Sequence, residues 1–360
     1  MTRIWQICAL TALAAGIASA HAAPRDRSLD NLQGGDAAAV QTTVQSAKAY
    51  HRASDDVTIS VQFTNTGSAA VTLPQWLLDG DDVDRSFLKV TRNGAPVAYT
   101  AALVKRANPT ADELLVLMPG QSVTASYELS SAFDLSSGGS FEVSFGAVAQ
   151  NAATSNVQPS ESISIGVEAN PFRDIIADID YGKAAGAGGI SYTGKCTASQ
   201  KSTLVTALSN ALVYSDGAKN YLTNTTPSGT PRYSTWFGTY SSSNWNTVKS
   251  HYTNISSVYN TQPIVFDCSC KKTNTYAYVY PSQPYKIYLC GAFWNAPATG
   301  TDSKAGTLVH ETSHFTVVAG TQDYAYGQSA AKSLAISNPA QAIMNADSHE
   351  YFAENTPAQQ

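Results

Sequence analysis

The chain has 360 residues and a formal net charge of −5, and its composition divides near residue 182. Residues 23–182 hold 10 basic and 19 acidic side chains and four of the tyrosines, whereas residues 183–360 hold 11 basic and 8 acidic side chains and 15 tyrosines. This length has room for two domains whose opposite charges attract, and a chain of this composition is expected to have neither a nucleic-acid nor a membrane partner.

Residues 1–22 have the pattern of a signal peptide. Arg3 precedes an apolar run from Ile4 to Ile17, and small residues follow at Ala18, Ser19 and Ala20. The apolar run is shorter than the roughly 20 residues that cross a bilayer, and no later stretch approaches that length. We therefore expect an exported, extracellular protein.

Residues 23–182 read as an all-β, sandwich-like domain. Segments 57–63, 123–129 and 141–145 alternate apolar and polar residues, segment 86–90 does so less cleanly, and glycine-containing turns separate them. An acidic loop with Asp79, Asp81, Asp82 and Asp84 could bind calcium or face solvent or a partner. No catalytic constellation is visible in this half.

A glycine- and alanine-rich linker, residues 181–189, spans the boundary between this half and the second domain, residues 183–360. Small residues leave such a segment flexible and open to proteolysis. We interpret residues 23–182 as a propeptide, with a permanent accessory domain as the alternative.

The second domain begins with a helical pattern from Thr197 to about Ser215. Segments 276–280 and 285–290 then predict a hairpin around Pro281 and Pro284.

Four cysteines remain once Cys8 is assigned to the signal peptide, and they allow two disulfides in three connectivities. Cys268 and Cys270 are separated by one residue, so each should pair outward, with Cys196 or Cys290. Binding of a metal ion by these cysteines is the weaker alternative, since no histidine accompanies them.

The most informative stretch is residues 306–327, which contains the HExxH pentapeptide, residues 310–314. On a helix, His310 and His314 lie on one face and can hold a single zinc ion, and Glu311 can act as the base. Capping residues at 301–303, the absence of proline from 304 to 318 and the stop at Gly320 support the helix.

Zinc requires a third protein ligand. The metzincin pattern is excluded because Val317 and Gly320 stand where it needs glycine and histidine. A later glutamate, Glu350 or Glu354, is one candidate. Asp323 is the preferred one, because it is nine residues past His314 and just after the turn at Gly320.

The segments GTLVHETSHF and GTQDYAYG resemble the aspzincins, the deuterolysin family of zinc endopeptidases. The resemblance implies an α+β zincin-type domain with one catalytic zinc ion on His310, His314 and Asp323. It also implies that Glu311 is the base and that Tyr326 stabilises the oxyanion. For the cysteines it implies the pairs Cys196–Cys268 and Cys270–Cys290.

Five of the eight acids in the second domain fall between residues 311 and 354. If the later segment is helical, Asp347 and Glu350 are neighbours that could stabilise a cation, although a solvated helix face is the alternative. MNADSHEYFAEN resembles the fungal peptidyl-Lys metalloendopeptidases, which implies that this pair binds a substrate lysine and that cleavage falls on its N-terminal side. His349 is expected not to bind metal. The resemblance covers about residues 191–357.

These observations predict a secreted zinc metalloendopeptidase that acts on lysine-containing proteins and is inhibited by its own propeptide. Lys105 or Lys183 would occupy the lysine pocket, and maturation would cut Gly182–Lys183. Two alternatives remain open at this point, an aspzincin of broad specificity and a non-catalytic secreted protein with structural zinc.

Overall fold

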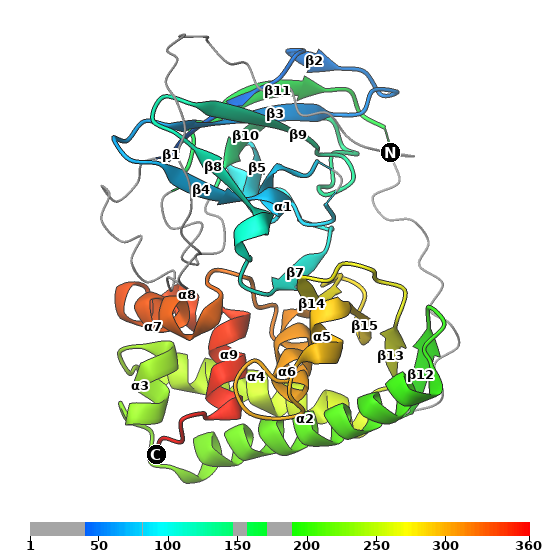
Figure 1. Ribbon diagram of the computed structural model, residues 1–360, viewed down its shortest axis with the longest axis vertical. Coiled ribbons are helices and arrows are strands. Elements are labelled where there is room, and N and C mark those ends of the chain that lie inside the picture. The colour runs from blue at the N-terminus through cyan, green and yellow to red at the C-terminus, as the bar shows by residue number, and fades with distance from the viewer. Residues whose placement is uncertain (1–39, 81, 147–156, 171–188) are drawn as a thin grey trace, which may run out of the picture.

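The computed structural model describes residues 40–80, 82–146, 157–170 and 189–360. An all-β part lies at one end of the molecule and a helix-rich part at the other (Figure 1). The expected signal peptide and most of the linker, including Gly182 and Lys183, lie outside the described residues.

Two sheets form the core of the all-β part. A three-stranded sheet has the order β1 (Val40–Gln45), β3 (Thr58–Asn65), β9 (Ser122–Glu128). A five-stranded sheet has the order β2 (Tyr50–His51), β11 (Ile163–Val167), β10 (Gly139–Phe145), β5 (Leu88–Arg92), β6 (Ala95–Pro96). The smaller elements are β4 (Val71–Pro74), which pairs with β8 (Leu114–Leu117), the short helix α1 (Gln75–Leu78) and a 3₁₀ turn (Ala111–Glu113).

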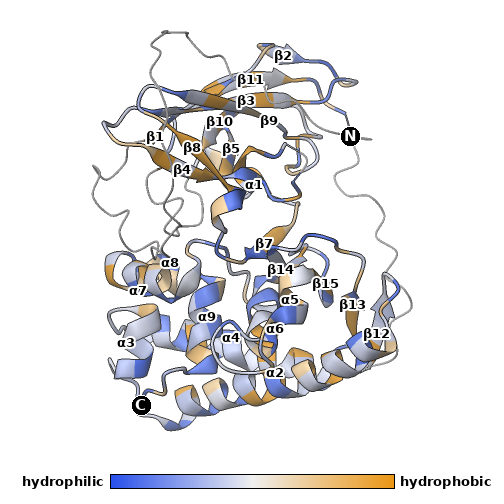
Figure 2. Cartoon of the chain, in the orientation of Figure 1, coloured by the Kyte–Doolittle hydropathy of each residue, from blue (hydrophilic) through white to orange (hydrophobic). Residues whose placement is uncertain are grey.

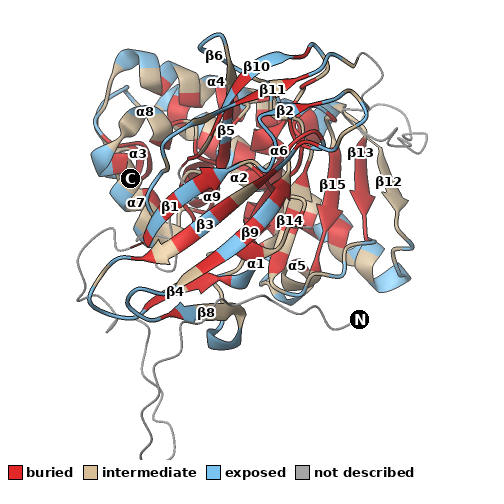
Figure 3. Ribbon diagram, turned by 90° about the horizontal axis from the view of Figure 1, so that it is seen from above, coloured by how far each residue is buried: buried red, intermediate tan, exposed pale blue. Residues whose placement is uncertain are grey.

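Alternating burial explains this sandwich. Along β3, every second residue is buried, and Figure 3 shows the same alternation on β1 and β9. Phe63 of β3 meets Phe145 of β10 edge to face, with ring centroids 5.3 Å apart, so the two sheets share one core. The strands predicted at 57–63, 123–129 and 141–145 are confirmed, with bounds shifted by one or two residues.

A second five-stranded sheet belongs to the helix-rich part, with one exception. Its order is β12 (Ile190–Thr193), β13 (Ile264–Asp267), β15 (Lys286–Leu289), β14 (Thr275–Val279), β7 (Leu103–Arg106). β13 and β15 are buried along their whole length (Figure 3), and β13 is strongly hydrophobic (Figure 2). The predicted hairpin is confirmed as β14 and β15. The exception is β7, which comes from the N-terminal half and pairs antiparallel with β14 between the two parts (Figure 1).

Eight helices are described beyond residue 189: α2 (Ala198–Asn224), α3 (Pro231–Phe237), α4 (Ser242–Thr261), α5 (Gly291–Asn295), α6 (Lys304–His314), α7 (Gly327–Ser337), α8 (Pro339–Ala342) and α9 (Ala346–Glu354). α2 begins as expected after Thr197, whose hydroxyl accepts the Gln200 amide. It continues past Ser215 because the buried stripe continues through Ala218 and Leu222. None of the described helices combines the length and apolar character needed to cross a membrane.

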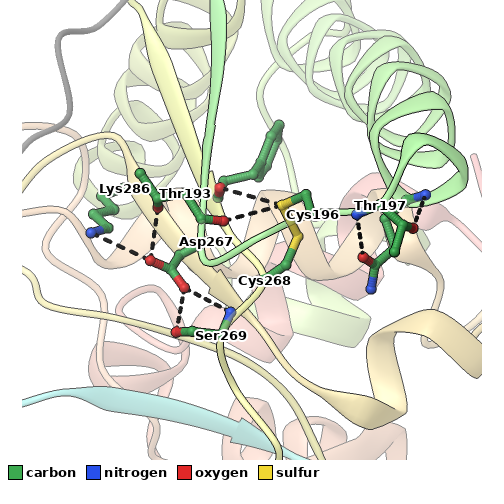
Figure 4. The surroundings of a disulfide bond; sticks show 9 residues. Thr193, Cys196, Thr197, Asp267, Cys268, Ser269 and Lys286 are labelled. Atoms are coloured by element: carbon green, nitrogen blue, oxygen red, sulfur yellow. Dashed lines mark hydrogen bonds and ion pairs between the residues drawn. A yellow bond between two sulfur atoms is a disulfide. The ribbon is translucent and has the colours of Figure 1, made fainter.

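Both disulfides that the family resemblance implied are present. Cys196–Cys268 joins the start of α2 to the end of β13, and Cys270–Cys290 joins the following loop to the start of α5. Beside the first, the Asp267 carboxylate accepts bonds from the Thr193 hydroxyl and the Ser269 amide (Figure 4).

Candidate metal centre and active site

Helix α6 presents the HExxH residues. The Ser303 hydroxyl caps its start by accepting the Gly306 amide at 2.9 Å. His310, Glu311 and His314 are completely buried, and the two imidazole rings are 4.8 Å apart. The helix ends at His314, before the expected stop at Gly320, because the Thr316 amide bonds to the Pro281 carbonyl instead of continuing the helical ladder.

A loop after α6 brings Asp323 back to the two histidines. The Thr321 amide donates to the Ser313 carbonyl. The Gln322 amide donates to the Met344 carbonyl, and the Gln322 carbonyl accepts the Ala346 amide at the start of α9. As a result, Asp323 Oδ1 lies 3.2 Å from His310 Nε2 and 3.4 Å from His314 Nε2. The structure therefore brings together the three residues expected to bind zinc.

These three side chains fit a zinc ion. Among the described residues, neither Nε2 atom and neither Asp323 oxygen has a hydrogen-bond partner, although all are buried. Ligands at about 2.1 Å from a tetrahedral zinc are roughly 3.4 Å from one another, which agrees with the observed distances. His314 Nδ1 lies 2.9 Å from the Thr321 carbonyl, which directs its Nε2 toward the centre. Of the two alternative ligands, Glu354 instead accepts the Ser303 amide at 2.9 Å, and Glu350 accepts a hydrogen bond from Lys105 at 2.6 Å.

Glu311 and Tyr326 flank this centre. Glu311 is completely buried, its two oxygens have no hydrogen-bond partner within the described part of the chain, and burial raises its pKa to about 7. A carboxyl group poised near neutrality can both accept and return a proton. The Tyr326 hydroxyl donates to the Val104 carbonyl of β7 at 2.5 Å. Burial raises the pKa of Tyr326 well above its usual range, so this hydroxyl remains a donor.

Helix α9 places Asp347 and Glu350 beside the centre, where both are at most 1% exposed. The solvated helix face that we considered is therefore wrong. Asp347 Oδ1 is 2.8 Å from His310 Nδ1, and Asp347 Oδ2 accepts the Gly327 amide at 2.6 Å. Asp347 thus contacts a candidate zinc ligand through Oδ1 and the first residue of α7 through Oδ2.

The cation between Asp347 and Glu350 is Lys105 of β7. Its Nζ is 2.6 Å from Glu350 Oε2 and 3.3 Å from Asp347 Oδ1, and the side chain is 2% exposed. Burial alone would lower the pKa of Lys105, but the carboxylates of Asp347, Glu350 and Asp302 hold it well above its usual value. Of the two lysines considered, the structure describes only Lys105.

A second charge cluster joins the two halves of the chain. Arg106 Nη2 is 2.9 Å from Asp82 Oδ1. The second carboxylate oxygen, Asp82 Oδ2, is 2.5 Å from Nζ of Lys272, which belongs to the helix-rich part. Asp84 joins the cluster at 3.4 Å from Arg106. Within the acidic loop, Asp82 and Asp84 are therefore buried and partner-facing, and Asp81 lies outside the described residues.

Several supporting residues left no signal in the sequence. The Asn345 side chain accepts the amides of Tyr324 and Ala325, which fixes the loop that carries Asp323 and Tyr326. His349, as expected, is not at the metal centre. Its Nε2 lies 3.0 Å from His251 Nδ1, and its Nδ1 lies 2.9 Å from the Asn345 carbonyl.

The buried pair of histidines predicts a loss of stability in acid. Burial lowers the pKa of His251 to about 4 and that of His349 to about 3. Both values are below the unfolded value of about 6.5, so the unfolded state binds more protons in between. The free energy of unfolding should be at its full value above about pH 6.5 and should fall toward pH 4. The expected slope is about 1.4 kcal/mol per pH unit for each extra proton that the unfolded state binds.

Urea unfolding between pH 7 and 4 would measure this slope, with Glu311→Gln as the background to prevent autolysis. His251→Gln keeps a polar partner for His349 and removes one of the two titrating groups. The slope of the unfolding free energy against pH should therefore fall by about 1.4 kcal/mol per pH unit. Equal slopes with and without this substitution would contradict the prediction.

Comparisons with known proteins place the chain among metallopeptidases. The aspzincin family model, described as lysine-specific metallo-endopeptidase, matches residues 221–354. The extracellular protease of Aeromonas hydrophila is 42% identical over 316 residues, which cover 85% of this chain and 90% of that protein. A peptidyl-Lys metalloendopeptidase of Armillaria mellea is 41% identical, with 85% and 89% covered. A solved structure, a zinc peptidase from Grifola frondosa, is 56% identical over 46% of this chain and 100% of that chain, with a TM-score of 0.44.

The chain is a zinc metalloendopeptidase, a hydrolase that acts on peptide substrates. Because relatives above 40% identity match most of both chains, it belongs to the aspzincin family. From the motifs, we expected the resemblance to cover about residues 191–357. The Aeromonas hydrophila protein matches 85% of the chain, so the similarity extends into the N-terminal half as well. Family membership also decides against the non-catalytic alternative.

Proposed function

We propose that this protein is an exported zymogen and that its mature form cleaves peptide bonds on the N-terminal side of lysine. Residues 23–182 are the inhibitory propeptide and residues 183–360 the catalytic domain. One observation carries the proposal: Lys105 Nζ is buried between Glu350 and Asp347, at 2.6 and 3.3 Å.

This contact supports both parts of the proposal. Two buried carboxylates without a cation would be costly, so the pocket fits an ammonium group. A substrate lysine can supply that group once the propeptide has left. While Lys105 supplies it, the pocket is closed to substrates, which is the basis of inhibition.

The backbone of β7 supports a substrate-like mode of binding. It pairs antiparallel with β14, with Lys105 opposite Ala277 and Val104 opposite Tyr278. This is the addition of an extended peptide to a sheet edge. The Val104 carbonyl, directly before Lys105, accepts the Tyr326 hydroxyl at 2.5 Å. In a substrate, the carbonyl before the lysine is the one to be attacked.

In the mechanism that we propose, His310, His314 and Asp323 hold the zinc ion. When bound, zinc supplies Lewis-acid polarisation of the scissile carbonyl and the attacking water. Glu311 removes a proton from this water and delivers it to the leaving amine. Tyr326 donates a hydrogen bond to the carbonyl oxygen as negative charge develops on it, and Asp347 and Glu350 bind the lysine.

Sequencing of product ends tests the specificity. The mature form is incubated with a denatured protein, with and without a zinc chelator. We expect nearly all new N-termini to begin with lysine, and we expect none to form in the presence of chelator, because zinc is needed for hydrolysis.

The matched control is the same denatured protein with every lysine replaced by arginine, which should remain largely uncut. Chelator-sensitive cuts without preference for lysine would retain the zinc site and exclude the lysine pocket. The enzyme would then be an aspzincin of broad specificity.

Export and maturation complete the proposal. The signal-peptide pattern of residues 1–22 supports export, as does the similarity to the extracellular protease of Aeromonas hydrophila. The maturation cut at Gly182–Lys183 rests on the linker composition and on the lysine after the bond.

A further inference from the structure

A third carboxylate, Asp302, lies near the ammonium group of Lys105. Its Oδ1 is 3.8 Å from Lys105 Nζ, against 2.6 and 3.3 Å for Glu350 and Asp347. The side chains of those two residues are at most 1% exposed, whereas that of Asp302 is 41% exposed. Asp302 is therefore the solvent-facing member of the group.

The position of Asp302 is fixed by its neighbours. The buried Tyr351 hydroxyl donates to Asp302 Oδ1 at 2.7 Å. The Asp302 amide donates to Glu354 Oε2 at 3.2 Å. The backbone at Asp302 has φ 52°, a left-handed conformation that aspartate and asparagine tolerate better than most residues. The carboxylate is thus held toward the pocket from the turn before α6.

The other two carboxylates leave a role for this charge. Asp347 is shared between Lys105, His310 Nδ1 and the Gly327 amide, so only part of its charge serves the ammonium group. Asp302 is one of three carboxylates that hold the pKa of Lys105 above its ordinary value. The Tyr276 ring, with its centroid 5.2 Å from Lys105 Nζ, adds an aromatic face.

Building on the proposed function, we propose that Asp302 is a further specificity-determining residue, which attracts the substrate lysine at the entrance of its pocket and is oriented there by Tyr351. Because its side chain is partly exposed, its contribution is smaller than that of the buried pair and is reduced by salt.

Asp302→Asn in the mature enzyme tests this role. Asparagine keeps the acceptor for Tyr351 and tolerates the backbone conformation, so only the charge is lost. The substrates are two peptides that differ after the scissile bond, one with lysine and one with norleucine, which is uncharged and of similar length. We expect KM for the lysine peptide to rise about fivefold with kcat nearly unchanged, since an exposed charge pair binds ground and transition states alike. We expect kcat/KM for the norleucine peptide to be unchanged.

Two further variants separate charge from structure. Tyr351→Phe should raise KM for the lysine peptide by a smaller factor, because Asp302 keeps its charge but loses its orientation. Asp216→Asn on α2, outside the pocket, should change nothing. The effect of Asp302→Asn should also shrink in 1 M salt.

An unchanged KM for the lysine peptide in Asp302→Asn would overturn the inference. Equal losses for both peptides would also overturn it, because Asp302 would then act only on the shape of the turn. If the wild-type enzyme already lacks a preference for lysine, the proposed function fails together with this inference. A wild-type preference that Asp302→Asn leaves intact rejects Asp302 alone.

Discussion

Glu311→Gln is expected to abolish hydrolysis while leaving the fold and the bound zinc unchanged. Glutamine has nearly the same shape, and Glu311 is buried without a hydrogen-bond partner among the described residues, so little is lost in the folded state. What disappears is the carboxylate whose pKa burial raises to about 7 and which, in the proposed mechanism, exchanges a proton with the attacking water and the leaving amine. We expect kcat to fall by about 10³-fold or more.

The measurements are kcat on a lysine peptide, zinc content and thermal unfolding, with Asp216→Asn as the matched carboxyl-to-amide control. Activity within tenfold of the wild type would rule out Glu311 as the base. If zinc is lost as well, the inactivity has another cause. Mass spectrometry of the same variant tests maturation: if the cut at Gly182–Lys183 is autocatalytic, the variant should remain full-length.

Lys105→Met is expected to release the inhibition of the full-length chain. Methionine fills a similar volume but leaves Glu350 and Asp347 buried without their cation. Removing one partner of a buried ion pair costs roughly 3–5 kcal/mol. This penalty applies only while the propeptide is docked, so the equilibrium constant for docking should fall by roughly 10²- to 4 × 10³-fold.

The experiment compares two chains that both carry Lys183→Gln, which blocks the proposed maturation cut. The chain that also carries Lys105→Met should cleave a short lysine peptide much faster than its parent. Lys89→Met, at an exposed lysine on β5, is the control and should remain latent. If Lys105→Met remains equally latent, β7 pairing and the Arg106 cluster would suffice for inhibition, and the lysine would not be its basis.

The fold was predictable wherever short-range patterns specify it. Alternation identified the strands at 57–63, 123–129 and 141–145. Each belongs to a sheet with one face toward the core and one toward solvent, so every second side chain is buried. The length of α2 was underestimated because the buried stripe between Leu204 and Leu222 consists of alanine and serine, which are weakly hydrophobic. The placement of β7 in the catalytic sheet was not predicted, because pairing with a strand about 170 residues later leaves no local periodicity.

The residues of the candidate site also fall into two groups, those that local sequence patterns predict and those that depend on distant contacts. His310, Glu311 and His314 follow from the four-residue spacing of a helix, and Asp323, Tyr326, Asp347 and Glu350 were implied by motifs carried on short segments. Asp302, Tyr351 and Asn345 were missed as functional residues. Each acts through a contact with a residue at least 20 positions away, and aspartate, tyrosine and asparagine in isolation indicate nothing about such contacts.

By itself, therefore, the sequence determined the chemistry: a zinc peptidase motif on a helix, an acidic pair three residues apart, and two halves of opposite net charge. These properties depend on residue type and on spacing within one or two helical turns. Only the tertiary structure decided that Lys105 occupies the acidic pair, because this contact spans 245 residues. The same holds for the Asp82–Lys272 contact across the two halves. Such contacts depend on how the sheets and helices pack, which no short stretch of sequence encodes.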